Sequence, residues 1–475
     1  MKLPKEFEAY TEKLMGSELY AQLLQGLAEE PHAFVRTNPF KGASFAICGS
    51  KGTVEWYEHG HWFANKPNFT FDPLLHAGVY YVQEKSSMFL AQVLRQDIKG
   101  PVTMLDMCAA PGGKSTLARV VLPADSLLVC NEPVRQRAQV LSENVQKCGI
   151  AEAIVTNNYP EEYRKAGLMF DVILCDVPCS GEGMFRKDAN AIKEWSIGNV
   201  DKCSRLQREI VKSAWECLRP GGLLVYSTCT FNAKENEENV QWICKELKGE
   251  PVSVDICKEW NICGSLLSGF DAPVYRFIPR YVGNKDSVQG EGLFMAVLRK
   301  PRGKADRKPS TTVKQQKKGR QPVKLDTTWL QNSDDFNIMQ EGYSLIAIPK
   351  DMQSLYDAVA DKLRVLHAGI RLGEVKGKDI VPDQSLALSL LLDREAFPIA
   401  ELPYEQAIRF LRKEAVTLPI GTPKGFVLIT YMGMPLGFEK HLGSRSNNLY
   451  PQEWRIKSTY MPDIAPQLYK LINDK

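Results

Sequence analysis

Short apolar segments alternate with helical patterns between residues 100 and 300. Most of these segments are near-continuously apolar, which is typical of strands in a parallel sheet that helices cover on both faces; they lie at residues 102–107, 126–131, 153–157, 171–176 and 222–227. Helical patterns occur at residues 114–121, 134–149 and 203–218, and Gly149 stands where helices commonly end in a left-handed residue. The alternation predicts an α/β domain with a doubly wound, mostly parallel sheet.

The flanking segments follow less regular patterns. Residues 1–100 are mixed, with two helices expected near the start. Residues 275–279 and 292–300 are expected to form a final hairpin on the sheet edge. Residues 424–438 predict two strands joined by a turn at 432–435, within a small mixed or β-rich domain. An α+β N-terminal domain and a smaller C-terminal domain therefore flank the sheet.

A basic segment separates the two halves of the chain. Residues 299–324 carry eleven Lys and Arg and one Asp, a local charge of +10 in a chain whose net charge is +4. The segment has almost no apolar residues and cannot bury enough surface to fold. We interpret it as a linker, either a solvated spacer or a contact for a polyanion such as nucleic acid. The expected division of the chain is 1–100, a lead-in domain; 101–300, the α/β domain; 301–324, the linker; 325–385, an intermediate domain; and 386–475, the small C-terminal domain.

Composition excludes several classes of protein. The 475 residues are 44% hydrophobic and 24% charged, which excludes a wholly disordered chain, a collagen-like fibre and a coiled-coil rod. Neither a run of 18 apolar residues nor a secretory signal occurs, so we expect a cytoplasmic protein without membrane attachment. None of the twelve cysteines forms a C-x-x-C pair and the six histidines are scattered, so no metal site is expected.

A loop of small residues follows the first strand of the sheet. The sequence DMCAAPGGKST, residues 106–116, leads from that strand into a helix and so places a helix N-terminus at the carboxyl edge of the sheet. A P-loop would fit Gly113, Lys114 and Ser115 but requires Gly where Cys108 stands, and a G-x-G-x-x-G dinucleotide fingerprint is absent. A loop for S-adenosylmethionine, whose glycines let the backbone approach the cofactor, is the third interpretation.

Glu132 ends the next strand. It follows Gly113 by nineteen residues, which is the place for a carboxylate that binds ribose hydroxyls. A nucleoside cofactor is therefore favoured over a P-loop, the alternative being that Glu132 is an ordinary surface carboxylate.

Two cysteines and a carboxylate stand at the ends of two further strands. Asp176 ends the strand at 171–176 and Cys179 follows it three residues later, while Cys229 follows the strand at 222–227. Since the carboxyl ends of adjacent parallel strands converge on the ligand crevice, these side chains should meet beside the cofactor loop. The alternative is that both thiols are ordinary buried cysteines.

A thiol beside a methyl donor suits methylation at carbon 5 of a pyrimidine. That carbon becomes nucleophilic only after a thiolate adds to carbon 6, and a carboxyl group near ring nitrogen 3 stabilises the charge that develops there. A base then removes the proton from carbon 5, and elimination frees the enzyme. The two thiols and Asp176 are residue types suited to these roles.

These segments resemble the Sun-type family of RNA cytosine-5 methyltransferases. The resemblance covers residues 1–300 and rests on the blocks DMCAAPGGKST, LCDVPCSGEGMFRKD and VYSTCTFNAKENE, with HAGVYYVQEKSSM before them. It implies the S-adenosylmethionine-dependent methyltransferase fold, with Cys229 as nucleophile, Cys179 assisting product release and Asp176 in contact with the base. It also implies that S-adenosylmethionine is held by Asp176, Glu132 and the loop residues Cys108, Ala109, Ala110, Pro111, Gly112, Gly113 and Lys114.

The second half of the chain extends the resemblance. RLGEVKGKDIVPDQSLALSL and GFEKHLGSRSNNLYPQEWRI are similar to the C-terminal half of RsmF-like ribosomal RNA methyltransferases, which ends in a PUA-like RNA-binding domain. The expected partner is structured RNA, namely small-subunit rRNA or the assembling subunit, which the lead-in domain at 1–100 and the PUA-like domain at 386–475 are expected to bind. We expect a monomer. RNA contacts by stacking and phosphate pairing would suit four residues, of which the first could instead pack in a core: Trp454, Arg455, Lys440 and Arg445.

Two other functions remain as alternatives. One is an RNA-binding assembly factor without turnover, which the presence of both Cys179 and Cys229 disfavours. The other is a methyltransferase for proteins or small molecules, which the basic linker and the C-terminal module disfavour.

Two positions depart from the family pattern. The family usually has an Asp near the adenine after the third strand, where this chain has Asn157-Asn158-Tyr159. It commonly has a His after the Pro at 279, where this chain has Arg280. Asn158 or a backbone group is expected to recognise the adenine instead. Neither position carries one of the chemical roles, so we expect an active enzyme.

Overall fold

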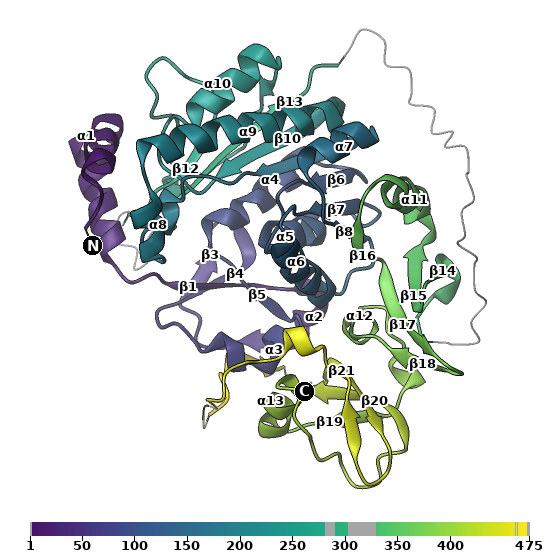
Figure 1. Ribbon diagram of the computed structural model, residues 1–475. Coiled ribbons are helices and arrows are strands. Elements are labelled where there is room, and N and C mark those ends of the chain that lie inside the picture. Colours follow the sequence, from purple (N-terminus) through teal and green to yellow (C-terminus); the bar gives the residue numbers. More distant parts are fainter. Residues whose placement is uncertain (1, 281–289, 303–328, 461, 463, 473–475) are drawn as a thin grey trace.

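A computed structural model describes residues 2–280, 290–302, 329–460, 462 and 464–472 (Figure 1). Most of the basic linker expected at 301–324 lies outside the described residues. The lead-in region, the central α/β region and the two C-terminal regions follow one another along the chain. Short 3-10 turns occur at η1 (Phe69–Phe71), η2 (Ser86–Phe89), η3 (Glu182–Met184), η4 (Lys258–Trp260), η5 (Ser333–Asp335), η6 (Lys350–Met352), η7 (Arg394–Ala396) and η8 (Gln452–Trp454).

A mixed sheet forms the centre of the molecule. Its strands are β6 (Thr103–Asp106), β7 (Leu127–Asn131), β8 (Ala153–Thr156), β9 (Phe170–Asp176), β10 (Leu218–Thr228), β11 (Glu250–Pro251), β12 (Tyr275–Phe277), β13 (Leu293–Arg299) and β16 (Val365–Ala368). They lie in the order β11-β13-β10-β9-β6-β7-β8-β16, with β12 paired to β13. The five central strands are parallel, whereas β13 and β16 run antiparallel to their neighbours. The predicted doubly wound, mostly parallel sheet is confirmed.

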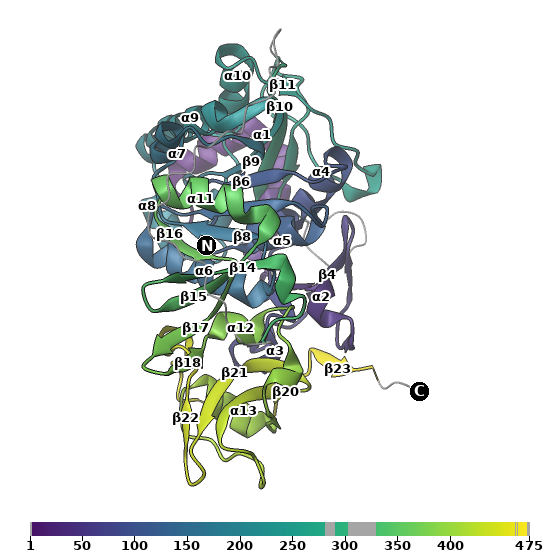
Figure 2. The ribbon, with the colours of Figure 1, turned by 90° about the vertical axis from the view of Figure 1, so that its right-hand side faces the viewer.

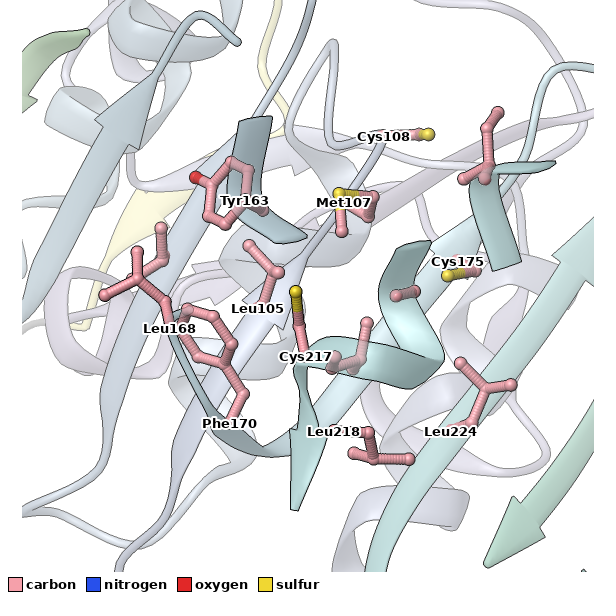
Figure 3. Close-up of a cluster of buried hydrophobic side chains, with 14 of the residues drawn as sticks. Leu105, Met107, Cys108, Tyr163, Leu168, Phe170, Cys175, Cys217, Leu218 and Leu224 are labelled. Atoms are coloured by element: carbon pink, nitrogen blue, oxygen red, sulfur yellow. The ribbon is translucent and has the colours of Figure 1, made fainter. Parts of the chain in front are cut away.

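Helices cover both faces of this sheet because alternate strand residues point to opposite sides. They are α4 (Leu90–Asp97), α5 (Gly113–Val121), α6 (Arg135–Cys148), α7 (Pro160–Ala166), α9 (Ile197–Cys217) and α10 (Glu237–Glu246). The short helix α8 (Ala189–Glu194) has no buried residue and packs in a separate cluster away from these two faces. On β9, Ile173 and Cys175 join a core with α7, α9 and α10, part of which Figure 3 shows. Val172 and Leu174 join the opposite core with α4, α5 and α6. As expected, α6 ends at Gly149, which has φ +85° and whose Cβ would lie 2.7 Å from the Leu388 carbonyl oxygen.

The lead-in region consists of a helical segment and a small sheet. Its elements are α1 (Lys5–Ala28), β1 (Ala33–Thr37), α2 (Pro39–Gly42), β2 (Phe45–Ile47), β3 (Gly52–Val54), β4 (Tyr57–Phe63), α3 (Pro73–His76) and β5 (Tyr80–Val82). The helix α1 breaks at Gly16, where φ is +76°, so the two predicted helices are present. The sheet has the order β3-β4-β1-β5. Arg36 of β1 donates to Gln83 Oε1 at 2.8 Å and to Thr116 Oγ1 of α5 at 2.7 Å, which joins the lead-in sheet to the central region.

Two smaller sheets follow the linker. The first has the order β14-β15-β17-β18, and the second β19-β20-β21-β22. Their elements are β14 (Phe336–Glu341), β15 (Ser344–Pro349), α11 (Gln353–Lys362), β17 (Ile370–Lys376), β18 (Asp379–Pro382), α12 (Gln384–Leu388), β19 (Ile399–Glu401), α13 (Tyr404–Leu411), β20 (Gly425–Tyr431), β21 (Met434–His441) and β22 (Ser446–Asn448), followed by β23 (Tyr469–Leu471), which pairs with β2. The predicted hairpin of β20 and β21 is confirmed, with positive φ at Met432 and Gly433 in its turn. Figure 2 shows the second sheet at one end of the molecule.

The intermediate region is continuous with the central sheet. The strand β16 pairs with β8, and side chains of β14, β15 and α11 share the hydrophobic core that α7 and α9 cover. The buried side chain of Lys41 connects the lead-in region, the central region and α12. Its Nζ donates to the carbonyl oxygens of Ala77, Lys147 and Leu388 at 2.7–2.9 Å. Burial lowers the pKa of Lys41 to about 7.

Candidate active site

The carboxyl ends of β6, β9 and β10 lie side by side in the sheet. Ser227 of β10 is in register with Asp176 of β9, and Asp106 of β6 is in register with Leu174 of β9. The loops that follow these three strands therefore begin at one edge. This is the edge at which open α/β sheets bind ligands, because helix N-termini and loop N–H groups face it.

Two thiols from different loops meet at this edge. Cys179 Sγ and Cys229 Sγ are 3.0 Å apart, although the residues are 50 positions apart in sequence. The hydrogen bond raises the pKa of Cys179 well above its ordinary value and lowers the pKa of Cys229. The pair therefore favours a protonated Cys179 that donates to a Cys229 thiolate, and the thiolate is the nucleophilic form of cysteine.

Asp176 is held beside the thiols by two polar neighbours. Lys114 Nζ lies 2.8 Å from Asp176 Oδ2, and the Ser227 hydroxyl donates to Asp176 Oδ1 at 2.6 Å. Burial alone would lower the pKa of Lys114, but the Asp176 carboxylate raises it above its ordinary value. The cation also lowers the pKa of Cys229 through its charge, although burial and Asp176 act in the opposite direction. The three predicted residues Asp176, Cys179 and Cys229 thus belong to one site.

The predicted cofactor loop is fixed from the side of α6. The Asn144 side chain donates to the Pro111 carbonyl oxygen at 2.8 Å, and Arg137 donates to that of Ala110 at 3.0 Å. Gly112 has φ +110°, and a Cβ there would lie 3.2 Å from the Leu141 side chain. Gly112 therefore requires the conformational freedom of glycine at the turn into α5. The remaining loop residues Cys108 and Ala109 are nearly buried, and Gly113 and Lys114 begin α5.

Gly113 faces the lead-in sheet. A Cβ at Gly113 would lie 3.2 Å from the Tyr81 ring of β5. Tyr81 belongs to the block that precedes the first strand in the family resemblance. The lead-in sheet therefore supports the start of α5 directly.

Glu132 lies at the carboxyl end of β7, beside this loop. Its Oε1 accepts from the Val134 backbone N–H at 3.0 Å, and its Oε2 lies 3.6 Å from Arg137 Nη2. The Glu132 side chain is 2% exposed. It is therefore a buried carboxylate oriented by the start of α6 and not an ordinary surface carboxylate.

The three residues that replace the usual Asp after β8 differ in exposure. Asn157 donates to the carbonyl oxygens of Glu132 and Pro133, and Asn158 donates to Glu162 and accepts from the Arg364 N–H. Tyr159 is 68% exposed. The Asn158 amide is thus already engaged inside the protein, which disfavours the expectation that it recognises an adenine ring.

Asp106 was not singled out among the site residues. It is 1% exposed, its Oδ2 accepts from the Ser115 hydroxyl at 2.6 Å, and its Oδ1 has no hydrogen-bond partner among the described residues. Burial raises the pKa of Asp106 to about 7. In the sequence, Asp106 could have been recognised as a site residue from its place at the end of the strand before the loop. An unsatisfied buried oxygen beside a helix N-terminus and two further carboxylates fits a ligand that carries donors and positive charge.

A second group of residues missed by the sequence analysis lies beneath the thiols. Glu182 and Glu235 are both 0% exposed, and each accepts several hydrogen bonds from the loops that carry Cys179 and Cys229. In the sequence, Glu235 could have been recognised from the polar end of the VYSTCTFNAKENE block, which has no apolar periodicity. Arg280, the other departure from the family pattern, donates to Gln22 of α1 at 3.0 Å.

The residues proposed for RNA contact have unequal exposure. Trp454 is partly buried, lies edge-on to Tyr450 and sits beneath Lys147 Nζ, which is 5.5 Å from its ring centre. Lys440 forms an ion pair with Asp379 at 3.2 Å. Arg445 and Arg455 are exposed. The packing alternative is therefore favoured for Trp454, and the two arginines remain available to a ligand.

The described residues contain no group of three or more His, Cys, Asp or Glu side chains that could hold a metal ion. None of their helices is both long and apolar enough to span a membrane.

Three family models match the chain in the order of its regions. Residues 3–85 match the N-terminal domain of 16S rRNA methyltransferase RsmF, and residues 94–298 match 16S rRNA methyltransferase RsmB/F. Residues 397–456 match the PUA domain of methyltransferase RsmF.

Curated relatives resemble the chain over most of its length, and solved structures resemble its fold. The chain is 31% identical to ribosomal RNA small subunit methyltransferase F of Klebsiella pneumoniae (strain 342), and 84% of each chain is covered. It is 32% identical to the protein of the same name from Escherichia coli (strain K12), again over 84% of each chain. A methyltransferase homologue from Pyrococcus horikoshii has a similar fold, with a TM-score of 0.51 and 24% identity over 62% of this chain and 95% of that one. NSun6 from the same organism, solved with SFG, also has a TM-score of 0.51, with 20% identity over 63% of this chain and 99% of that one.

Proposed function

This chain belongs to the RsmB/F family of 16S rRNA methyltransferases, and we propose that it forms 5-methylcytosine in small-subunit ribosomal RNA through a covalent bond from Cys229. The observation that carries the proposal is the pair of thiols 3.0 Å apart, next to the Lys114–Asp176 ion pair. The RNA class is taken from the relatives, whose names specify the small ribosomal subunit.

S-adenosylmethionine is the proposed methyl donor, and when bound it supplies an electrophilic methyl group. The residues that would hold it are those of the loop from Cys108 to Lys114, with Glu132 and Asp176 as carboxylates. Asp106 joins this set because its buried Oδ1 has no partner among the described residues. Helix N–H groups suit the carboxylate of the methionine end, and carboxylates suit ribose hydroxyls and positive charge.

Cys229 is the proposed nucleophile. Its thiolate adds to carbon 6 of the cytosine, so that a sulfur–carbon bond forms and the electron pair of the ring double bond becomes available at carbon 5. The hydrogen bond from Cys179 and the charge of Lys114 both lower the pKa of Cys229, which increases the thiolate fraction available for attack.

Asp176 is proposed to contact the ring near nitrogen 3, where charge develops when the thiolate adds. Lys114 and Ser227 fix both oxygens of its carboxylate, so little reorganisation is needed during the reaction. A preorganised carboxyl group at this place can give a proton to nitrogen 3 as that atom becomes basic and take it back on elimination, which stabilises the adduct relative to free cytosine.

Cys179 is proposed to assist release of the product. After methylation a base removes the proton from carbon 5, the bond between Cys229 and carbon 6 breaks, and the ring double bond re-forms. The Cys179 thiol, 3.0 Å from Cys229 Sγ, can donate to the departing thiolate and so stabilise it. Loss of this thiol should therefore slow elimination more than attack.

The proposal is tested by supplying the purified protein with S-adenosylmethionine and either naked small-subunit rRNA or assembled small subunits. We expect 5-methylcytosine in the digested RNA with the wild-type protein and none with Cys229→Ala. Cys257→Ala is the matched control, since Cys257 is exposed and distant in sequence from the strand-end loops. Methylation by Cys229→Ala at the wild-type rate would refute the assignment of the nucleophile, and methylation of another RNA in preference to both substrates would refute the assignment of the RNA.

A further inference from the structure

The polar segment that follows Cys229 is buried but has no part in the chemistry above. Asn232, Glu235, Asn236 and Glu237 are all between 0% and 2% exposed. Burying such side chains costs free energy unless hydrogen bonds satisfy them. Their contacts therefore indicate what the segment stabilises.

Glu235 accepts hydrogen bonds from three directions. The Ser180 backbone N–H and the Gln207 side chain donate to its Oε2 at 3.0 and 2.6 Å, and the Asn232 side chain donates to its Oε1 at 2.8 Å. Ser180 directly follows Cys179, Gln207 lies on α9, and Asn232 lies in the loop after Cys229. One carboxylate thus connects both thiol-bearing loops to a helix.

Further bonds join the same two loops. The hydroxyls of Ser180 and Thr230, the residues that follow the two cysteines, are 3.0 Å apart. The Gly183 N–H donates to the carbonyl oxygen of Cys229 itself at 2.9 Å. Glu182 Oε2 accepts from the backbone N–H groups at the start of the second loop. The separation of the two sulfur atoms is therefore determined by bonds between their loops as well as by the sheet.

We propose that Glu235 is a positioning residue that holds Cys179 within hydrogen-bond distance of Cys229 and so keeps Cys229 reactive. The Glu235 side chain is 0% exposed, and among the described residues its carboxylate is hydrogen-bonded by these loops and α9, so it acts through the thiols and not on the RNA. The proposal rests on the assignment of Cys229 as the nucleophile.

Glu235 affects the pKa of Cys229 in two ways of opposite sign. One is the charge of its carboxylate, and the other is the position in which it holds Cys179. A nearby negative charge disfavours a thiolate, and Glu235 raises the pKa of Cys229 in this way. Removal of the charge alone would therefore lower the pKa of Cys229. Loss of the Cys179 hydrogen bond, which is the largest influence on Cys229, would raise it. The direction of the change distinguishes the two effects.

The test is the pH profile of alkylation at Cys229 in the absence of RNA, measured with iodoacetamide and peptide mass spectrometry. Glu235→Gln keeps the shape of the side chain but places an NH2 group against one of the three donors. We expect the midpoint for Cys229 to rise by about one pH unit, and kcat to fall about 10-fold at a pH below that midpoint, because a unit shift changes the thiolate fraction tenfold. KM for RNA and affinity for S-adenosylmethionine should stay within about twofold of wild type, since no substrate contact is lost.

Glu238→Gln is the matched control. Glu238 lies three residues further on, is partly exposed and lies 3.8 Å from Lys234. We expect neither its alkylation profile nor its kcat to differ from wild type.

Three results would overturn the proposal: an unchanged Cys229 midpoint in folded Glu235→Gln, a lowered midpoint, or a loss confined to KM. Should Glu235→Gln not fold, Ser180→Ala decides the matter, because it removes the hydroxyl bond between the loops and leaves the carboxylate in place. A raised midpoint in Ser180→Ala supports positioning, and an unchanged one contradicts it. Because the profile is measured without RNA, failure of the Cys229 nucleophile assignment, seen as methylation by Cys229→Ala, is a separate outcome.

Discussion

The loops that carry the thiols and the second C-terminal sheet both bury a glutamate, but in opposite ways. Glu235 beneath the thiols is 0% exposed and accepts hydrogen bonds from Ser180, Gln207 and Asn232. Glu439 on β21 is also 0% exposed, yet neither of its carboxylate oxygens has a hydrogen-bond partner among the described residues. A buried carboxylate that is fully bonded fixes its surroundings, whereas an unbonded one destabilises the folded state when it is charged.

The same contrast holds for the residues that sequence patterns suggested as functional. At the strand ends, three residues chosen for their chemistry and position, Asp176, Cys179 and Cys229, belong to one hydrogen-bonded site. In the C-terminal region, residue type alone suggests Trp454 and Lys440, and each already has a partner within the chain, a surface ion pair in the case of Lys440. Position at the end of a strand is thus more informative than residue type. Changes at the strand ends should alter kinetics, and changes in the second sheet should alter stability.

The largest effect is expected for Asp176→Asn. This change keeps the size of the side chain but removes the charge that Lys114 and Ser227 orient. Loss of one preorganised electrostatic group typically lowers kcat by about 10²- to 10³-fold, and we expect this range with RNA affinity retained. Single-turnover methylation measures the effect, with Asp201→Asn on α9 as the control. A decrease below threefold would exclude Asp176 from the reaction and remove the contrast between the two regions.

A smaller effect, on cofactor affinity, is expected for Glu132→Ala. A charge-assisted hydrogen bond contributes about 1.5–3 kcal/mol, which corresponds to a roughly 10- to 100-fold weaker affinity. Calorimetric titration with S-adenosylmethionine measures it, and Glu152→Ala, a partly exposed carboxylate near Arg119, is the control. Because Glu132 also accepts from the Val134 N–H, the melting temperature is measured in parallel. Equal affinity in the variant and the wild type would contradict the placement of the cofactor beside β7.

Trp454 and Arg455 are adjacent, but their substitution by alanine should change the stability of the protein by different amounts. Trp454→Ala removes ring contacts with Tyr450 and Lys147 and should lower the free energy of unfolding by about 2 kcal/mol. Arg455→Ala removes an exposed side chain and should change stability by less than about 0.5 kcal/mol. Denaturant unfolding and RNA binding are measured for both. A Trp454→Ala variant of unchanged stability that loses RNA affinity would instead support a stacking role.

The smallest effect is expected for Glu439→Gln and appears in the pH dependence of stability. Burial raises the pKa of Glu439 to about 7. The unfolded chain releases this proton at lower pH than the folded chain does. The protonated group therefore contributes its whole stabilisation below the unfolded pKa, and this contribution is lost as the pH rises through about 7. The melting temperature of Glu439→Gln should therefore fall less than that of wild type between pH 5 and 7.5. Glu453→Gln, an exposed change, should follow wild type, and a parallel fall in all three proteins would show that Glu439 does not titrate in this range.

The order of strands and helices in the central region could be predicted because each strand there is a short apolar segment next to a helical pattern. The cofactor loop and the two cysteines could be placed because parallel strands end at one edge. Other features depend on contacts between distant segments, which no local pattern encodes. Examples are the pairing of β16 with β8, the three carbonyl oxygens around Lys41 and the three donors around Glu235. The partners of Asn158 are a further example, since its amide is bonded to Glu162 and to the Arg364 N–H, 206 residues away.

The central claim is that Cys229 forms the covalent bond and Cys179 ends it. The most direct measurement is denaturing gel electrophoresis of the protein after incubation with small-subunit RNA and S-adenosylmethionine, for wild type, Cys179→Ala, Cys229→Ala and the double variant. The account predicts a retarded, RNase-sensitive protein–RNA adduct with Cys179→Ala and none with Cys229→Ala or the double variant, because the two sulfur atoms have separate roles although they lie 3.0 Å apart. An adduct with Cys229→Ala and none with Cys179→Ala would contradict it and make Cys179 the nucleophile.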